Sequence, residues 1–334
     1  MIEFDNVTKE YPDGTVAIDD VSFTVERGTT TVLVGPSGCG KTTTMKLVNR
    51  LEDPTSGCVR FDGTNVEELD KIDLRRDIGY VIQEIGLFDH MTVRDNIATV
   101  PELKGWETER INDRVDELLE LMDLPPATYR DQYPTELSGG QRQRIGVARA
   151  LAADPEVMLM DEPFGALDPI TREDLQNEFL EIQSELDVTI LFVTHSIDEA
   201  LKMGDKIAIY DVGKVVQYDT PAQILRSPDT KFVEDFIGAD RALKQLQVRQ
   251  VGDLMQGSKP DGASRRPDGR VDLQSTNGTG VEPLSAAASM QVALSRMIQH
   301  DVDVMPVGDA GSVEGWISRD AIQRETRVET EVRS

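Results

Sequence analysis

The stretch GPSGCGKTTT, residues 35–44, decides how the first part of the chain folds. It follows the apolar run TVLV at 31–34 and opens a helical pattern, so it joins a predicted strand to a predicted helix. Its spacing, G-x-x-x-x-G-K-T, is that of a P-loop. The glycines let backbone N–H groups turn toward a phosphate, and the helix N-terminus adds its partial positive charge. The stretch therefore predicts a nucleotide phosphate site.

Two residues of the loop have specific expected roles, and a second element supports them. Lys41 should bridge the β- and γ-phosphates, and the Thr42 hydroxyl should ligate Mg²⁺. The apolar run of VMLMDEP ends in Asp161 and Glu162. In isolation such a pair equally fits two solvated acids at a strand end. Beside a P-loop, Asp161 is the candidate metal ligand and Glu162 the candidate general base.

Composition limits the partners and the compartment. The chain has 334 residues and a formal charge of −26, with 61 acidic against 35 basic residues. This field disfavours nucleic acid and anionic headgroups as direct partners. Asp outnumbers Glu, which is typical of proteins from salt-loving organisms, although an ordinary acidic cytosolic enzyme also fits. Two cysteines, Cys39 and Cys58, argue against a disulfide framework and for a reducing compartment.

The apolar segments are too short to span a bilayer. The opening MIEFDNVTKE has no basic flank and no apolar core, and the longest apolar runs, such as VMLM and ILFV, have the length of strands. We expect neither an export signal nor a membrane span.

Strand and helix patterns alternate along the first 240 residues. This alternation predicts an α/β fold with a mainly parallel sheet covered on both faces. A one-sided helix follows from Ile111, Val115, Leu118, Leu119 and Met122. The expected parallel strands are 31–34, 78–82, 157–160, 189–193 and 207–210, and an antiparallel β edge is expected from 2–7 and 16–25.

The pattern changes after about residue 240, which suggests a first domain over 1–240 and a small α+β domain over 241–334. Residues 256–280 are rich in Gly, Ser, Asp and Pro, and with almost nothing to bury they are predicted to be disordered. Beyond them Met290, Ala293, Met297 and Ile298 predict a short helix. Strands are expected at 302–307 and 313–317.

A third element, LSGGQ at 137–141, leads directly into the helical stretch QRQRIGVARALAADP, with Ile145, Ala148 and Leu151 or Ala152 on one side. Two glycines before a helix make a second helix N-terminus with free N–H donors. One nucleotide does not need both termini in one chain.

With this element the chain resembles the ATP-binding cassette (ABC) ATPases over about residues 1–235, with a helical subdomain expected at about 84–155. In that family two copies sandwich ATP, one giving the P-loop and the other the LSGGQ signature. The resemblance makes Gln83 the Q-loop glutamine near Mg²⁺, Asp168 the D-loop acid that faces the other copy, and His195 the contact to the γ-phosphate. It implies a homodimer in which each chain holds half of each site.

The P-loop and the resemblance together assign the site. The expected catalytic residues are Lys41, Glu162 and His195, and the expected Mg²⁺ ligands are Thr42, Gln83 and Asp161. ATP contacts are expected from Tyr11, Gly35, Pro36, Ser37, Gly38, Cys39, Gly40, Lys41, Thr42, Thr43, Gln83, Ser138, Gly139, Gly140, Gln141 and Asp168. Tyr11 should stack on adenine, although it equally fits an edge-strand aromatic. Cys39 is expected to be passive.

The resemblance extends to importers. QEIGLFDHMTVRDNIATVP and FVEDFIGADRALKQL look most like the subfamily for quaternary amines such as glycine betaine, choline or carnitine. Leu87, Phe88, His90 and Met91 are expected to dock a membrane permease at the cytoplasmic face, with an extracytoplasmic solute-binding protein as an indirect partner. They also fit core residues at a helix entry. An importer for another solute, such as a polyamine, and an ABC ATPase outside transport are the alternatives.

The tail has a resemblance of its own. VRQVGDLM and SMQVALSRMIQHDVDVMPVGDAGSVEGWISRDAI resemble a single CBS domain interrupted by the polar loop. Related importers commonly carry two such units in tandem. A single unit implies either regulation by an effector or support of the dimer.

Overall fold

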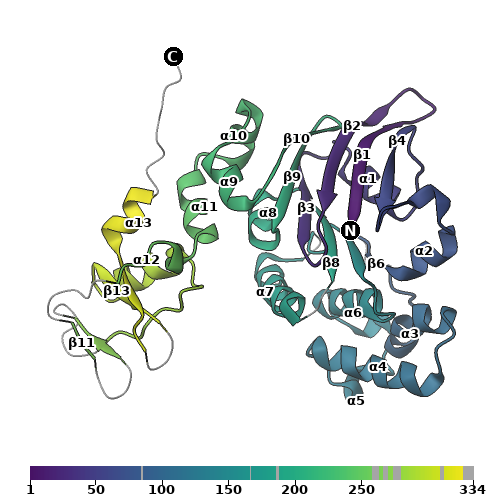
Figure 1. Cartoon of the computed structure of the whole chain (residues 1–334). Coiled ribbons are helices and arrows are strands. Elements are labelled where there is room, and N and C mark those ends of the chain that lie inside the picture. The colour runs from purple at the N-terminus through teal and green to yellow at the C-terminus, as the bar shows by residue number, and fades with distance from the viewer. Residues whose placement is uncertain are drawn as a thin grey trace. The chain divides into compact units, whose positions relative to one another are not determined.

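The computed structural model describes residues 1–83, 86–165, 167–185, 188–257, 263–265, 270–273, 280–308 and 312–325 (Figure 1). The chain divides into two compact units, Met1–Thr220 and Pro221–Ser334. Residues 221–240 thus group with the second unit, whereas sequence patterns put the change at about 240. The extent of each functional domain stays a prediction.

The first unit is built around a six-stranded sheet with the strand order β10-β9-β3-β8-β7-β6. Strands β3, β7 and β8 are buried along their whole length, because helices cover both faces of a parallel sheet. The predicted parallel strands are therefore confirmed, with β10 as an antiparallel edge. The strands are β3 (Thr30–Val34), β6 (Ile78–Val81), β7 (Val157–Asp161), β8 (Thr189–Thr194), β9 (Lys206–Asp211) and β10 (Lys214–Asp219).

A second sheet in this unit has the order β2-β1-β4-β5. The predicted antiparallel pair is present, but it forms this separate sheet and is not the edge of the parallel one. The core fills the space between the sheets and includes a stacked pair, Phe4 and Phe23, with ring centroids 4.5 Å apart. The strands are β1 (Ile2–Glu10), β2 (Val16–Val25), β4 (Ser56–Phe61) and β5 (Thr64–Asn65).

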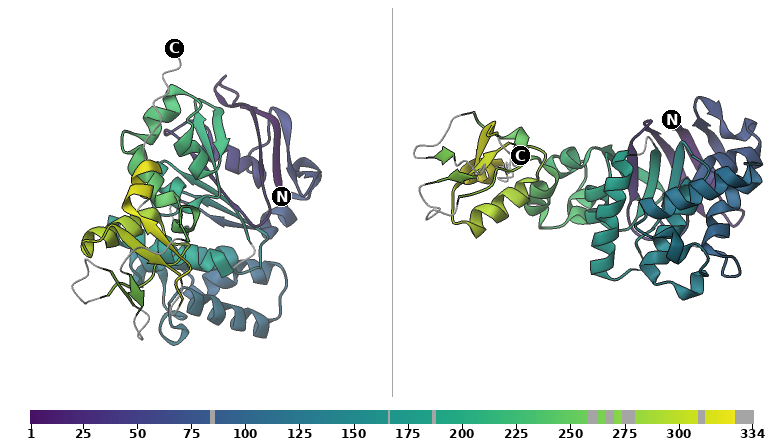
Figure 2. Two further views of the ribbon diagram at one scale, coloured as in Figure 1. Left: turned by 60° about the vertical axis from the view of Figure 1, so that its left-hand side comes forward. Right: turned by 90° about the horizontal axis from the view of Figure 1, so that it is seen from below.

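The helices of the first unit either cover the sheet or form a helical region between β6 and β7 (Figures 1 and 2). In that region the predicted stripe of α4 is buried and so is Met122, because a one-sided helix hides its apolar face. The helices are α1 (Lys41–Val48), α2 (Lys71–Asp77), α3 (Val93–Leu103), α4 (Thr108–Leu121), α5 (Pro126–Tyr129), α6 (Gly139–Leu151), α7 (Pro169–Glu185) and α8 (Ile197–Met203).

The second unit has a small core of its own, which includes Met290, Met297 and Val307. The helix expected from Met290, Ala293, Met297 and Ile298 is present as α12, but Ile298 does not join the core and is 65 % exposed. The elements are α9 (Pro221–Arg226), α10 (Lys231–Ile237), α11 (Arg241–Val248), β11 (Ser264–Arg265), β12 (Val271–Asp272), α12 (Met290–Gln299), β13 (Val304–Val307), β14 (Gly315–Ser318) and α13 (Arg319–Glu325).

The segment 256–280 is described only in part. Its described residues include the antiparallel pair β11 and β12, and Val271 is buried in the core of the second unit. The described residues of this segment thus place two apolar side chains, Ala263 and Val271, in that core, which differs from the expected loop with almost nothing to bury. The expected disorder of the segment as a whole stays a prediction. The remaining residues of this segment lie outside the described part of the chain.

Candidate functional site

The P-loop connects β3 to α1, as its sequence predicts. Gly40 is the N-cap of α1 and has φ of 107°, in the left-handed region that favours glycine. Lys41 is buried, and its Nζ donates to the carbonyl oxygens of Gly35 at 2.7 Å and Pro36 at 2.8 Å. The P-loop backbone therefore surrounds the ammonium group of Lys41. The first backbone N–H groups of α1 have no hydrogen-bond acceptor within the helix.

Gly40→Ala and Gly38→Ala should differ sharply in their effect. A Cβ on Gly40 would lie 2.3 Å from the backbone oxygen of Ala17, whereas a Cβ on Gly38 would meet nothing within 4 Å. Both residues have positive φ, so we expect Gly38→Ala to lower the free energy of unfolding by about 1 kcal/mol and Gly40→Ala by about 3 kcal/mol. Urea denaturation measures both. Equal losses would show that the contact with Ala17 is not what requires glycine.

Asp161 and Thr42 meet at the end of β7. Thr42 Oγ1 donates to Asp161 Oδ1 at 3.1 Å, and Asp161 is 8 % exposed. Burial raises the pKa of Asp161, and the hydrogen bond from Thr42 opposes this. A hydroxyl and a carboxylate are the oxygen donors that Mg²⁺ prefers, so these two residues fit the predicted metal site.

Three residues far apart in the sequence meet at one oxygen atom. Glu162 Oε2 accepts a hydrogen bond from Gln83 Nε2 at 3.2 Å and lies 3.2 Å from His195 Nδ1. Glu162 follows β7 and His195 follows β8, and the carboxyl ends of these neighbouring parallel strands lie at one sheet edge. Glu162 also has φ of 46°. A positive φ is uncommon for a residue with a side chain, and residues with this conformation cluster at functional sites. Of the predicted Mg²⁺ ligands, Gln83 thus contacts the candidate base.

The signature residues are engaged with their own helix. Ser138 is the N-cap of α6, where its Oγ accepts from Gln141 N at 3.3 Å and its N donates to Gln141 Oε1 at 2.9 Å. A hollow beside them is lined by residues of α6 and α7, including Gly140 and Thr171. These contacts leave the P-loop of the same chain out. In the described part of the chain, the signature residues and the P-loop thus share no contact.

Asp168 caps the other helix of this hollow. Its Oδ1 accepts from the backbone N–H groups of Ile170 at 3.2 Å and Thr171 at 3.1 Å, at the start of α7. Hydrogen bonds from the side chain and backbone of Thr171 hold the pKa of Asp168 below its ordinary value. Its contact with a second copy stays a prediction.

The remaining predicted ATP contacts surround the P-loop. The Tyr11 hydroxyl lies 3.4 Å from Thr43 Oγ1, and Lys9 Nζ lies 5.2 Å from the centroid of the Tyr11 ring. Burial raises the pKa of the Cys39 thiol, which keeps it protonated and agrees with a passive role. Pro36, Ser37 and Gly38 are exposed at the tip of the loop.

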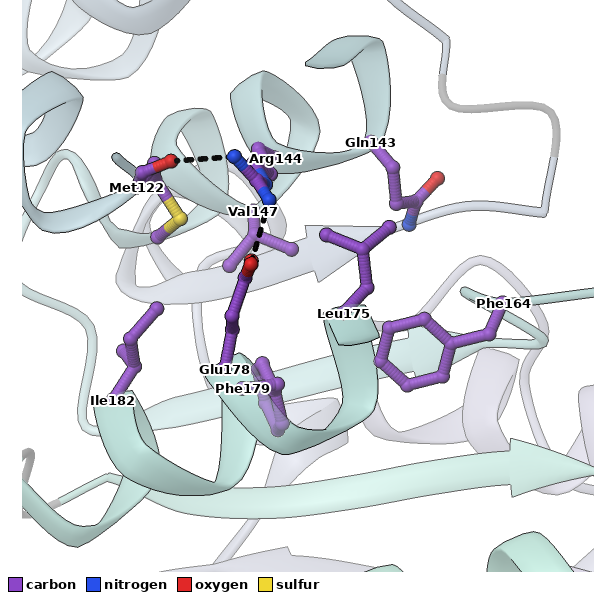
Figure 3. Close-up of a pocket in the computed structure, with 9 residues that line it drawn as sticks. All are labelled: Met122, Gln143, Arg144, Val147, Phe164, Leu175, Glu178, Phe179 and Ile182. Atoms are coloured by element: carbon purple, nitrogen blue, oxygen red, sulfur yellow. Dashed lines mark hydrogen bonds and ion pairs between the residues drawn. The ribbon is translucent and has the colours of Figure 1, made fainter. Parts of the chain in front are cut away.

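Two arginines of α6 were not predicted from the sequence. Arg144 donates to Glu178 Oε1 of α7 at 2.6 Å and to the carbonyl oxygen of Met122 after α4 at 3.4 Å, beside a cavity of about 20 Å³ (Figure 3). Arg149 donates to the carbonyl oxygen of Gly86 at 2.6 Å. Arg149 stands four residues after Ile145 and so lies on the same side of the helix. A charged residue within this apolar stripe is the sequence feature from which Arg149 could have been predicted.

The family follows from comparison with known proteins. The model of the family described as ABC transporter matches residues 18–165. A carnitine transport ATP-binding protein of Listeria monocytogenes is 46 % identical over 99 % of this chain and 78 % of its own length. The chain belongs to the ATP-binding proteins of ABC transporters. A choline transport ATP-binding protein of Bacillus subtilis is also 46 % identical, over 97 % of this chain and 80 % of its own. An osmoprotectant import ATP-binding protein of Salmonella typhimurium is 49 % identical over 76 % of this chain and 68 % of its own length.

Solved ABC cassettes confirm the predicted fold. The dimeric structure of a bacterial ABC transporter cassette has a TM-score of 0.60 and 33 % identity, covering 66 % of this chain and 99 % of that one. A cassette of Clostridium perfringens, part of a larger ABC transporter complex, has a TM-score of 0.62 and 28 % identity over 67 % and 89 %. Among the described residues, no helix of this ABC protein has the length and apolar character that crossing a bilayer requires.

Proposed function

We propose that the chain is the ATP-hydrolysing subunit of an importer for a quaternary amine osmoprotectant such as glycine betaine, choline or carnitine. The observation that carries the ATPase part is the shared oxygen of Glu162, which Gln83 and His195 approach beside the P-loop. The solute class rests on the relatives, since those named for carnitine, choline and osmoprotectants are 46–49 % identical to this chain.

The chain's own residues suit each step of hydrolysis. Lys41 binds the β- and γ-phosphates and offsets the charge that develops during phosphoryl transfer. Glu162 accepts the proton of the attacking water, and Gln83 and His195 hold its carboxylate in place. Mg²⁺, held by Thr42 and Asp161 with Gln83 nearby, would neutralise phosphate charge. Tyr11 and the P-loop amides orient the nucleotide.

The second half of each site would come from a second copy. Ser138, Gly139, Gly140 and Gln141 form the start of α6, whose free amides and partial positive charge suit a γ-phosphate. Within one chain their contacts leave the P-loop out, and the related cassette of 33 % identity is dimeric. Asp168 would face the same partner. ATP thus joins two protomers, and hydrolysis lets them part.

A permease would receive this movement at the cytoplasmic face of the membrane. The candidate docking residues follow Gln83, and among them Phe88 is 42 % exposed and His90 is also exposed. Their rings form an edge contact with centroids 6.1 Å apart. Exposed aromatic side chains of this kind mark interaction sites. The solute-binding protein acts on the permease from the other side and does not touch this chain.

The second unit is proposed to be a CBS-like regulatory or dimerisation module. Its support is the sequence resemblance, together with an independent core in which α12 and α13 pack on the antiparallel pair β13 and β14. A chain that lacks residues 241–334 should keep its basal rate of ATP hydrolysis. The dependence of that rate on ionic strength should change.

Asp161→Asn tests the proposed metal site. The amide keeps the shape and can still accept from Thr42, but it loses the charge that attracts Mg²⁺. We expect ATP to bind with little change, while the Mg²⁺ concentration for half-maximal hydrolysis rises about tenfold. Asp154→Asn, an exposed carboxylate paired with Arg114, is the matched control and should leave the titration unchanged. An unchanged Mg²⁺ requirement in Asp161→Asn would remove Asp161 from the metal site.

The solute assignment is tested in proteoliposomes that contain this chain and its permease. ATPase activity is measured with glycine betaine, choline, carnitine and spermidine at several salt concentrations. We expect stimulation by the quaternary amines alone. A response to spermidine alone would favour the alternative represented by a spermidine/putrescine import relative, which is 41 % identical. If no solute changes the ATPase activity, the assignment as an ATPase is retained but the assignment as an importer subunit is withdrawn.

A further inference from the structure

Arg149 links the signature helix to the segment that follows the Q-loop glutamine. Its Nη1 donates to the carbonyl oxygen of Gly86 at 2.6 Å, and its guanidinium carbon lies 5.8 Å from the centroid of the Phe88 ring. The side chain is partly buried, and this burial lowers the pKa of its guanidinium. The planar guanidinium suits both a carbonyl and an aromatic face.

The segment is closely packed at Gly86, the residue that Arg149 contacts. Gly86 has φ of 59°, and a Cβ there would lie 2.4 Å from Ile82 Cδ1. Ile82 directly precedes Gln83, whose amide bonds Glu162. On the other side, Asn96 of α3 accepts from Phe88 N at 2.8 Å and donates to the carbonyl oxygen of Phe88 at 3.1 Å. Gly86 and Phe88 are therefore in direct contact with the residue before Gln83 and with α3.

The other end of α6 lies in the opposite half of the proposed site. Ser138 caps the helix, and Arg149 stands near its last residue, Leu151. An α-helix rises 1.5 Å per residue, so the two ends are about 18 Å apart along one continuous helix. Arg144 adds a tie to α7, the helix that Asp168 caps (Figure 3).

We infer that Arg149 is a positioning residue that fixes the Gly86–Phe88 segment to the signature helix. Through this contact, a structural change caused by ATP binding at Ser138 is transmitted to the candidate permease surface. This inference rests on the proposed ATPase function but not on the solute or on the identity of the permease.

Amide hydrogen exchange in Glu162→Gln chains, with and without ATP, tests this role without a permease. We expect ATP to slow exchange in two regions of the otherwise unaltered chain, the P-loop and the amides of Phe88 and Met91, by about tenfold each. Arg149→Lys keeps the charge but loses the planar fork. It should retain the P-loop protection while the effect at Phe88 and Met91 falls below about twofold.

Two further variants separate positioning from stability. Gly86→Ala puts a Cβ on a residue with φ of 59° and against Ile82 Cδ1, so it should strain the segment while keeping the Arg149 side chain, and it should weaken the response at Phe88 and Met91. Arg130→Lys is the matched control, because Arg130 binds Asp116 and Asn112 within the helical region. It should keep both responses.

The inference is overturned by any of three results. One is a tenfold response at Phe88 that survives in Arg149→Lys, and another is the absence of that response in the otherwise unaltered chain. The third is that Arg149→Lys loses P-loop protection in parallel or unfolds at a much lower temperature than Arg130→Lys, which would make Arg149 a structural residue only. If ATP protects no region at all, the nucleotide site is at fault.

Discussion

Glu162→Gln should bind ATP normally and hydrolyse it about a thousandfold more slowly than the unaltered protein, because an amide cannot take a proton from water. The amide oxygen can still accept from Gln83 and His195, so the geometry around it is kept. Loss of one negative charge also reduces repulsion of the phosphates. ATP-bound dimers should therefore accumulate, and single-turnover kinetics with gel filtration measure both effects.

The matched control for this variant is Glu156→Gln. Glu156 lies just before β7, whereas Glu162 lies just after it, and the Glu156 side chain is 64 % exposed and paired with Arg27 at 2.7 Å. We expect its hydrolysis rate to stay within about twofold, because exposed ion pairs contribute little. Normal turnover in Glu162→Gln would mean that another group activates the water.

Two inactive variants should restore activity when they are mixed. Lys41→Met removes the proposed phosphate ligand of one half-site. Gly139→Asp puts a carboxylate at the start of α6, where it suits the helix but repels a γ-phosphate, and its Cβ meets Leu167 only at 3.9 Å. In an equal mixture, half of the dimers are hybrids, and each hybrid has one intact site of two. Activity should therefore recover to about a quarter of that of the unaltered protein.

Two controls make this experiment specific. Gly139→Ala adds the same Cβ without the charge and should keep most of the activity by itself. Mixing Lys41→Met with Glu162→Gln should restore nothing, because both defects fall in the same half-site. Full activity of Gly139→Asp alone, or no recovery in the first mixture, would refute the shared site and leave each chain with a complete one.

The sequence predicted the strands that lead to the P-loop and to the candidate site better than the elements elsewhere. The buried strands β3, β7 and β8 are short apolar runs between turn residues, and a local pattern of this kind needs no partner to be recognised. The pairing of β1 and β2 with β4 into a separate sheet was missed, because strand order depends on contacts distant in sequence. The hairpin of β11 and β12 was missed because its composition is polar.

Among the candidate site residues, the motifs identified each member but not its contacts. Gln83, Glu162 and His195 were named separately, and their meeting at a single oxygen depends on the order of the strands. Arg149 was missed because an arginine in a helix is ordinarily solvated, and its acceptor, the carbonyl of Gly86, has no signature in the sequence.

The sequence by itself determined the class of chemistry, since the glycine spacing of the P-loop, the strand ending in Asp161 and Glu162, and the LSGGQ stretch are local patterns. Only the tertiary structure decided which side chains share hydrogen bonds, and that α6 ties the signature to the segment after Gln83. The physical reason is that the spacing of residues along the chain sets local backbone geometry. Contacts between distant residues depend on how the strands and helices pack, which local spacing does not encode.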